Sequence, residues 1–213
     1  MRRGLSVIGL AFRLWWREVA LLTALNLAWL ALQIPIVTGP AATAAMYSVA
    51  RRLADDEVLL PRHAWDALRQ MLAPAWRWGA VNLLIVLALV VNFTTYASAG
   101  GWLWSGLRFV WGILALLWFA LNLFYWPFWL AQSDQRLVTT LRNCLLLYVR
   151  APAFGLTVLS VCLVLVVAGV LLTLPLAAGL MAWLALIGVL AVDTELKAGP
   201  ATALTPDVEL ENL

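Results

Sequence analysis

Residues 26–52 read NLAWLALQIPIVTGPAATAAMYSVARR, and this stretch decides how the chain is organised. It carries no charge until its last two residues, both arginines, and it is interrupted in its middle by Pro35, Gly39 and Pro40. Pro35 disfavours helical torsions in the residue before it and removes a backbone donor. Gly39 permits a turn, and Pro40 suits the first position of a new helix. We therefore predict two short helices joined by a turn, the first ending near Gln33 and the second starting at Pro40.

The composition indicates that the solvent of this chain is lipid. Of its 213 residues, 64% are hydrophobic and 12% are charged, whereas soluble domains average roughly 25% charged residues. Four charge-free runs each exceed the roughly 20 residues that cross a hydrocarbon core about 30 Å thick. These runs are residues 19–50, 78–107, 109–133 and 151–192. Because the runs are continuously apolar and do not alternate, they indicate helices rather than barrel strands.

The predicted fold is all-α, a polytopic helical membrane bundle of five to six membrane segments that include the proline- and glycine-broken hairpin. Residues 1–198 are expected to form a single membrane domain, and the polar tail 199–213 is expected to be disordered. Beyond the hairpin, the predicted spans are 79–97, 102–130, 154–172 and 176–192, with an external turn at Thr173–Pro175.

The positions of the arginines distinguish two topologies for residues 20–51. A single crossing would put the arginines that precede this stretch and those that follow it on opposite sides of the membrane. A hairpin puts nearly all of them on one side and leaves only Arg108 outside. Cytoplasmic loops are enriched in Lys and Arg, so the hairpin is favoured, with the single crossing as the alternative. Both termini are then cytoplasmic.

Two amphipathic segments are predicted on the cytoplasmic side. Residues 2–19 place apolar side chains at spacings of three and four, which is typical of a helix lying in the membrane surface; the alternative is an extension of the first span. The helix opened by Pro61 carries Trp65, Leu68, Leu72 and Trp76 on one face. It either lies on the membrane or docks on a partner, and Trp65 and Arg69 are the candidate docking residues.

The residue types favour binding over catalysis. No Asp, Glu, Lys or His falls inside a predicted span, which argues against a proton-coupled carrier. The single histidine, His63, has no HExxH pattern or cysteine partner, and the chain has no Walker A sequence. Neither Ser105 nor Ser160 has an obvious base. We therefore predict no catalytic residue, no metal or cofactor site and, because no separate basic face exists, no nucleic-acid partner.

Five carboxamide residues at membrane depth are either packing or functional groups. Hydrogen bonds between helices at such positions contribute about 0.6–2 kcal/mol each, which suits both interpretations. These residues are Asn26, Gln33, Asn82, Asn92 and Asn122.

Three motifs carry a resemblance to a known family: NLAW at 26–29, PIVTGPAATAAMY at 35–47, and the arginine pair that precedes the helix with Trp65. With these, the chain resembles the YesL-like family of bacterial integral membrane proteins, classed as a domain of unknown function. The similarity covers most of residues 5–195, although many members carry one more residue between the threonine and the glycine. The candidate functional motif is Asn26, Trp29, Pro35, Thr38, Gly39, Pro40, Tyr47, Arg51 and Arg52.

The resemblance implies a polytopic protein that is often encoded beside carbohydrate ABC importers and glycoside-degrading enzymes. The leading hypothesis is therefore a non-catalytic accessory component of oligosaccharide uptake, with the bilayer and ABC importer subunits as partners. The chain shows no EAA-type loop of the kind by which a permease docks an ATPase. One alternative is a small carrier or channel that uses the broken hairpin 34–41 as its site. A second is a membrane enzyme acting on a lipid-linked substrate. The oligomeric state stays open.

Overall fold

The computed structural model describes residues 2–173 and 177–198, and these residues form eight helices and no strand. The all-α prediction is therefore confirmed over this part of the chain. The predicted polar tail 199–213 and most of the predicted turn after Thr173 lie outside the described residues. The helices are α1 (Arg2–Arg17), α2 (Val19–Gln33), α3 (Gly39–Ala54), α4 (Pro61–Thr95), α5 (Trp102–Ala131), α6 (Leu137–Arg150), α7 (Pro152–Leu172) and α9 (Leu180–Ala198).

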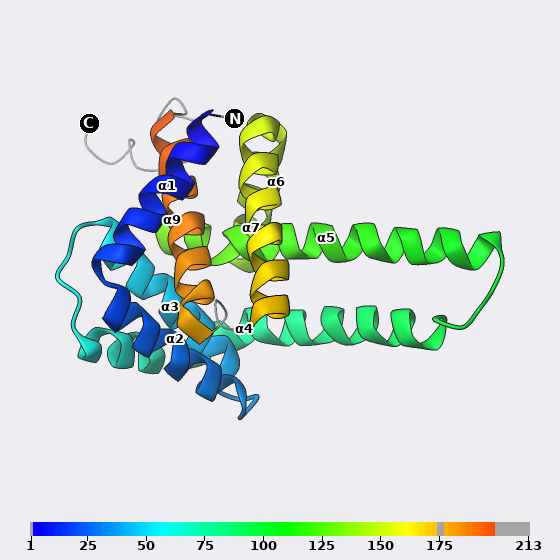
Figure 1. Ribbon diagram of the computed structural model, residues 1–213, viewed down its shortest axis with the longest axis horizontal. Coiled ribbons are helices and arrows are strands. Elements are labelled where there is room, and N and C mark those ends of the chain that lie inside the picture. The colour runs from blue at the N-terminus through cyan, green and yellow to red at the C-terminus, as the bar shows by residue number, and fades with distance from the viewer. Residues whose placement is uncertain (1, 174–176, 199–213) are drawn as a thin grey trace, which may run out of the picture.

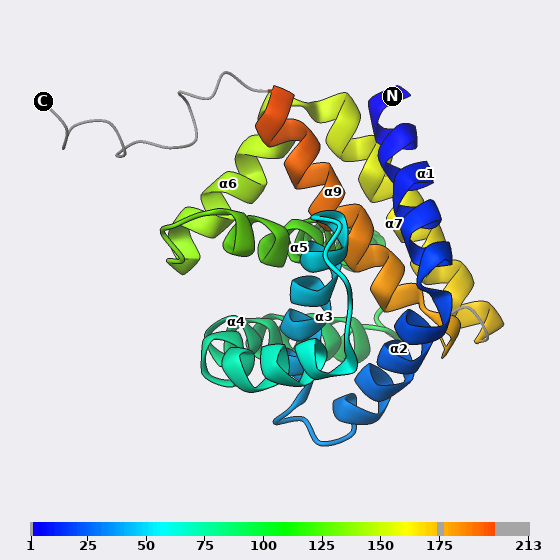
Figure 2. The ribbon, with the colours of Figure 1, turned by 90° about the vertical axis from the view of Figure 1, so that its left-hand side faces the viewer.

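The helices form a compact body and a projecting arm. Helices α4 and α5 run along the longest axis of the molecule and extend beyond the body as the arm, whereas α1, α7 and α9 run across that axis (Figure 1). A quarter turn shows α4 and α5 end-on, with α3 and α9 beside them in the body (Figure 2). The body therefore surrounds only the root of the arm, where the cavity described below is found.

Helix α9 is the centre of the body. Every residue from Leu180 to Val192 is buried except Trp183, because α1, α2, α3, α5 and α7 all pack against this helix. Its apolar sequence therefore faces protein on most sides, whereas the sequence predicted a membrane span here. Hydropathy alone cannot distinguish these two environments, since both require apolar side chains.

The chain breaks between α2 and α3, where the proline and glycine positions predicted a turn. The observed ends, Gln33 for α2 and Gly39 for α3, agree with the predicted ends to within one residue. The indole Nε1 of Trp29 on α2 donates a hydrogen bond to Oγ1 of Thr43 on α3 at 3.0 Å, which holds the two helices side by side.

One predicted boundary is wrong: the helix opened by Pro61 and the following span are a single helix of 35 residues, with Pro74 inside it. Of the predicted apolar face, Trp65 and Leu72 are open to the surroundings, at 53% and 40% exposed, whereas Leu68 is buried. The residues that α4 buries are mostly small, and α3 packs along them. This packing explains why the helix continues past a proline, which in isolation disfavours an interior helical position. The buried residues of α4 are Ala67, Leu68, Ala75, Trp78 and Gly79.

Helix α1 also packs through small side chains. Gly4, Val7 and Ala11 are buried, whereas Leu5 and Phe12, two members of the predicted membrane-facing stripe, are 57% and 44% exposed. These two side chains thus remain open to the surroundings, whereas Ile8 and Trp15 are half-buried against the core and the small residues meet α7 and α9. This arrangement is consistent with a helix that contacts protein on one side and lipid on the other.

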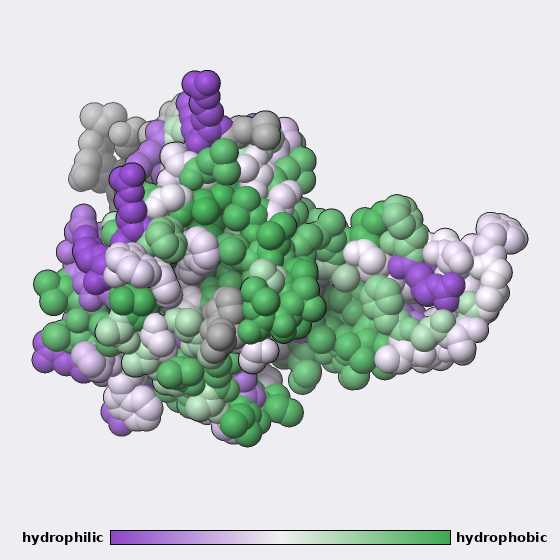
Figure 3. All heavy atoms as spheres, in the orientation of Figure 1, coloured by the Kyte–Doolittle hydropathy of each residue, from purple (hydrophilic) through white to green (hydrophobic). Residues whose placement is uncertain are grey.

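Three helices of the described chain are long and apolar enough to cross a membrane: α4, α5 and α7. The arm is largely hydrophobic along its length and polar at its tip (Figure 3). At the tip, Nη1 of Arg108 donates to the carbonyls of Tyr96, Ala97 and Ala99 at 3.0–3.2 Å. A soluble protein rarely exposes so large a continuous apolar surface, so the structure supports the membrane assignment. It identifies three candidate spans rather than the predicted five to six segments.

We expect Gly188→Ala to destabilise the body. A Cβ at Gly188 would lie 2.9 Å from the backbone carbonyl oxygen of Leu123 and 3.1 Å from Cγ of Pro127, so α5 and α9 would have to move apart. Overpacking of this kind costs about 1–3 kcal/mol. Thermal unfolding in detergent measures the effect. The control is Gly112→Ala, where a Cβ meets nothing within 4 Å; a similar loss in both variants would contradict the packing argument.

Candidate functional site

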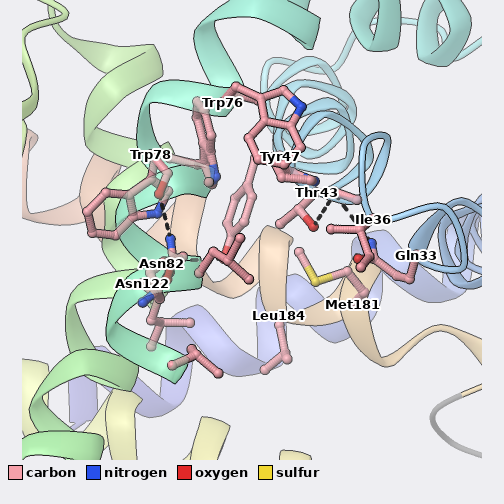
Figure 4. A pocket seen from close by; sticks show the side chains of 18 of the residues that line it. Gln33, Ile36, Thr43, Tyr47, Trp76, Trp78, Asn82, Asn122, Met181 and Leu184 are labelled. Atoms are coloured by element: carbon pink, nitrogen blue, oxygen red, sulfur yellow. Dashed lines mark hydrogen bonds between the residues drawn. The ribbon is translucent and has the colours of Figure 1, made fainter. Parts of the chain in front are cut away.

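A cavity of about 500 Å³ lies where α3, α4, α5 and α9 meet at the root of the arm (Figure 4). The C-terminal end of α2 and the turn that follows it border the cavity through Gln33 and Ile36. Its volume lies within the roughly 300–1,000 Å³ that is typical of small-molecule sites. We treat this cavity as the candidate functional site.

Helix α3 presents three residues of the predicted motif to the cavity: Gly39, Pro40 and Tyr47. The carbonyl of Gly39 accepts hydrogen bonds from Oγ1 of Thr43 at 3.1 Å and from Nε2 of Gln33 at 3.4 Å. A Cβ at Gly39 would lie only 2.7 Å from Oε1 of Gln33, so a larger residue here would displace the Gln33 side chain from its contact with the Gly39 carbonyl. The motif glycine thus allows the turn to close against the cavity.

Helix α4 approaches α3 closely at the same place. A Cβ at Gly79 would lie 2.7 Å from Cγ of Pro40. From Gly79, the same face of α4 continues into the cavity with Asn82, Leu83 and Val86. Because these positions are three and four residues apart, they share one face of the helix.

Asn82 and Asn122 form the polar part of the wall that α4 and α5 contribute, and Trp118, which is not a lining residue, holds both side chains. The amide oxygen of Asn82 accepts a hydrogen bond from Nε1 of Trp118 at 2.9 Å, and its Nδ2 donates to the carbonyl of Trp78 at 3.3 Å. Nδ2 of Asn122 donates to the carbonyl of Trp118 at 2.9 Å. Within the described residues, the amide oxygen of Asn122 receives no hydrogen bond, so it is available to a ligand.

Aromatic rings form the rest of this wall. Trp78 stacks on Tyr125 with ring centroids 3.9 Å apart and lies 5.0 Å from Trp118. The hydroxyl of Tyr47 projects toward the cavity (Figure 4) and donates only a long hydrogen bond, 3.4 Å, to the carbonyl of Leu123. Such a bond is weak, so a ligand with an acceptor group could replace it.

The lining determines which chemistry the cavity can perform. Among the lining residues that the structure describes, the only titratable side chain is the phenol of Tyr47; the others are apolar, aromatic, hydroxyl or carboxamide residues. Carboxamides and hydroxyls both donate and accept hydrogen bonds, and indole rings offer flat apolar faces. These groups suit the binding of an uncharged molecule. Among the residues that the structure describes, no group of three or more His, Cys, Asp or Glu side chains could hold a metal ion.

The motif arginines lie elsewhere, at the C-terminal end of α3. Arg51 forms ion pairs with Asp193 of α9 and, at 3.1 Å, with Asp55. Partial burial by itself lowers the pKa of Arg51, but the hydrogen bonds and charges of the two carboxylates outweigh it, so the net pKa is raised. Arg52 pairs with Glu57 at 2.7 Å. These contacts fix the end of α3 against α9 and against its own following loop.

Asn26 and Trp29 have packing roles in the hairpin. Asn26 is fully buried, and its amide oxygen accepts the backbone N–H of Met181 at 3.0 Å while its Nδ2 donates to the carbonyl of Ala177 at 3.3 Å. It thus joins α2 to the start of α9. Trp29 joins α2 to α3 through Thr43, as described above.

Pro35 and Thr38 shape the turn itself. The hydroxyl of Thr38 donates to the carbonyls of Leu32 and Pro35, which lie 2.6 and 2.9 Å away. The indole Nε1 of Trp76 donates to the carbonyl of Val37 at 2.8 Å and so ties the turn to α4. Side chains therefore satisfy backbone acceptors that the helices leave free.

The candidate docking residues Trp65 and Arg69 do not belong to the cavity. The guanidinium carbon of Arg69 lies 4.8 Å from the ring centroid of Trp65, a cation–π contact on the exposed side of α4. Trp65 also borders a second pocket of about 180 Å³ between α2, α3 and α4. Nearby, Nδ1 of His63 accepts the backbone N–H of Leu60 at 3.4 Å, a contact at the start of α4.

Sequence reasoning missed several lining residues. Trp78, Trp126 and Met181 were not singled out as site residues, and Asn82 and Asn122 were noted only as polar groups at membrane depth. The spacing of three and four that joins Phe119, Asn122, Leu123 and Trp126 on α5 could have indicated a shared face. No spacing of this kind singles out Met181, because it lines the cavity only as a result of the path that α9 takes.

The comparisons with known proteins cover part of this site. The profile of the family described as "Protein of unknown function, DUF624" matches residues 22–93, roughly a third of the chain. The match spans most of α2, all of α3 and nearly all of α4, and so contains the turn and the walls that these helices contribute. It is consistent with the YesL-like resemblance. No curated protein and no solved structure matched the chain. Over α2 to α4, the chain is therefore similar to a family whose function is not assigned.

Proposed function

We propose that this protein is a non-catalytic integral membrane protein that binds an uncharged ligand in the cavity at the root of the arm. The observation that carries the proposal is the lining: carboxamides, hydroxyls and indoles converge on one space, and the described part of the chain brings no carboxylate, amine or imidazole to it. An unpaired charge brought into such a place would lose its hydration without compensation. A ligand with hydroxyl groups and apolar faces would satisfy the lining.

The binding proposal predicts that Asn122→Leu weakens binding by roughly tenfold, about 1.4 kcal/mol, because a ligand hydroxyl loses its acceptor. The measurement is calorimetric titration of the protein in nanodiscs with octyl glucoside below its micellar concentration. Asn92→Leu is the matched control, since Asn92 is a half-buried asparagine on the arm that does not line the cavity. The absence of saturable binding of both octyl glucoside and maltose would refute the proposal.

The wider role that we propose is an accessory component of carbohydrate uptake by an ABC importer. The resemblance to the YesL-like family supports it, and the exposed pair Trp65 and Arg69 on α4 offers a docking surface. Exposed tryptophan and arginine side chains often dominate protein–protein binding energies.

Affinity purification from native membranes tests this role. Importer subunits should co-purify with the protein, and Trp65→Ala should lower their recovery by roughly tenfold, as expected for a residue that dominates an interface. Trp102→Ala is the control, because Trp102 is 87% exposed at the opposite end of the molecule. Recovery of the protein without any importer subunit would argue against the accessory role.

A small carrier or channel is the second candidate. The observation that favours it is that Gln33, Ile36 and Gly39 of the broken hairpin line the cavity, so a movement of the turn would change access to it. Flux of labelled maltose into vesicles that contain only this protein would select the carrier. A membrane enzyme acting on a lipid-linked substrate ranks below both, since the described lining supplies no acid–base pair.

We propose that the protein lies in the bacterial cytoplasmic membrane with both termini inside, in five to six segments that include the hairpin. The arginine distribution supports this topology. A cysteine introduced at Ser98, in the loop at the arm tip, should then react with an impermeant maleimide in intact cells. Cysteines that replace Arg62 or Arg69 should react only after the cells are opened. Labelling of position 62 or 69 from outside would overturn the topology.

A further inference from the structure

The rim of the cavity differs chemically from its interior. Only three lining residues are exposed: Ile36, Leu83 and Val86, at 68%, 52% and 47%. All three are aliphatic. The hydrogen-bonding side chains of the lining are all buried or half-buried. Any ligand that reaches the interior must therefore pass an aliphatic rim.

The surface around this rim is also apolar. Leu84 and Leu87 continue the exposed surface along α4, at 67% and 56% exposed. On the other side of the rim, Ile34 and Val37 of the turn are 83% and 65% exposed. Helix α4 is itself one of the helices long and apolar enough to cross a membrane. A continuous surface of this kind is stable against hydrocarbon and unstable in water.

The opposite side of the cavity is closed by protein. One turn beyond Tyr47 on α3, the ion pair of Arg51 with Asp193 joins α3 to α9. The lining residues that α9 contributes, Met181 and Leu184, are buried. The cavity therefore opens toward the apolar surface and not toward the charged end of α3.

From this geometry we infer that the cavity opens sideways into the bilayer and that its ligand is a lipid-borne amphiphile with an uncharged, hydroxyl-bearing headgroup. The inference rests on the proposed binding function and specifies its substrate class. The headgroup lies among Asn122, Tyr47 and the indole rings, and the hydrocarbon chain passes the rim between Ile36 and Leu83. A sugar free in water would have to cross lipid to arrive there.

Photolabelling in vesicles tests the access route. The probe is a monoglucosyl diacylglycerol with a diazirine in one acyl chain, at low mole fraction in phosphatidylcholine vesicles that contain the full-length protein. We expect cross-links on peptides from the cavity walls. Leu83→Trp, which narrows the rim, should lower this labelling by about tenfold. Leu84→Trp should leave it unchanged, because Leu84 lies at the same depth on α4 but outside the lining. If Leu83→Trp does not fold, Ile36→Trp narrows the rim from the other side.

Two outcomes would overturn the inference, and they have different meanings. Labelling that is unchanged by Leu83→Trp, or that is abolished by maltose added to the water phase, would show access from water. If octyl glucoside still binds in an Asn122-dependent way, the proposed binding function survives and only the lateral route fails. If the photoprobe, octyl glucoside and maltose all fail to bind, both proposals fail together.

Discussion

The close approach of helix backbones at glycine is the constraint on which the rest of this structure depends. At Gly79 there is no room for a Cβ beside Pro40, and at Gly188 none beside the carbonyl of Leu123. In lipid, helices gain little from hydrophobic burial against one another, so van der Waals contact between small residues must hold them together. The alanines of α3 likewise allow close van der Waals contact along its length, since Ala41, Ala44 and Ala50 are almost fully buried. Beside these points of tight contact, the large aromatic side chains of α4 and α5 enclose the cavity.

The broken hairpin solves a second problem, which is how to place a turn near hydrocarbon. A backbone carbonyl or amide without a partner costs several kcal/mol there. Side chains from three different elements provide the partners: Thr38 in the turn, Gln33 on α2 and Trp76 on α4. The motif residues therefore divide into two groups with different tasks. One group closes the turn and fixes α3 to its neighbours, and the other, Gly39, Pro40 and Tyr47, faces the cavity.

Sequence signals predicted those structural features that depend only on neighbouring residues. Pro35 and Pro40 located the ends of α2 and α3 because proline and glycine act on neighbouring torsions directly. The continuity of α4 through Pro74 could not be predicted in this way, because packing against α3 outweighs the local preference. The burial of α9 was equally hidden, since an apolar helix looks the same whether lipid or protein surrounds it. The cavity needed four helices to meet, so it could not be predicted; three of its lining residues, Gln33, Asn82 and Asn122, were evident only as carboxamides at membrane depth.

One face of α3 connects these features into a single arrangement. Thr43, Tyr47 and Arg51 follow one another at intervals of four residues, so a hydroxyl, a phenol and a guanidinium point the same way along the helix. The first two border the cavity, and the third pairs with Asp193 on α9. The guanidinium is paired outside the cavity, so the lining stays uncharged while the end of α3 is anchored to α9. The same pair joins the two helices on the side away from the arm, and the aliphatic rim on α4 and the turn is the side that remains open. The packing of α3 against its neighbours thus determines both where the charged side chains lie and on which side the cavity is open.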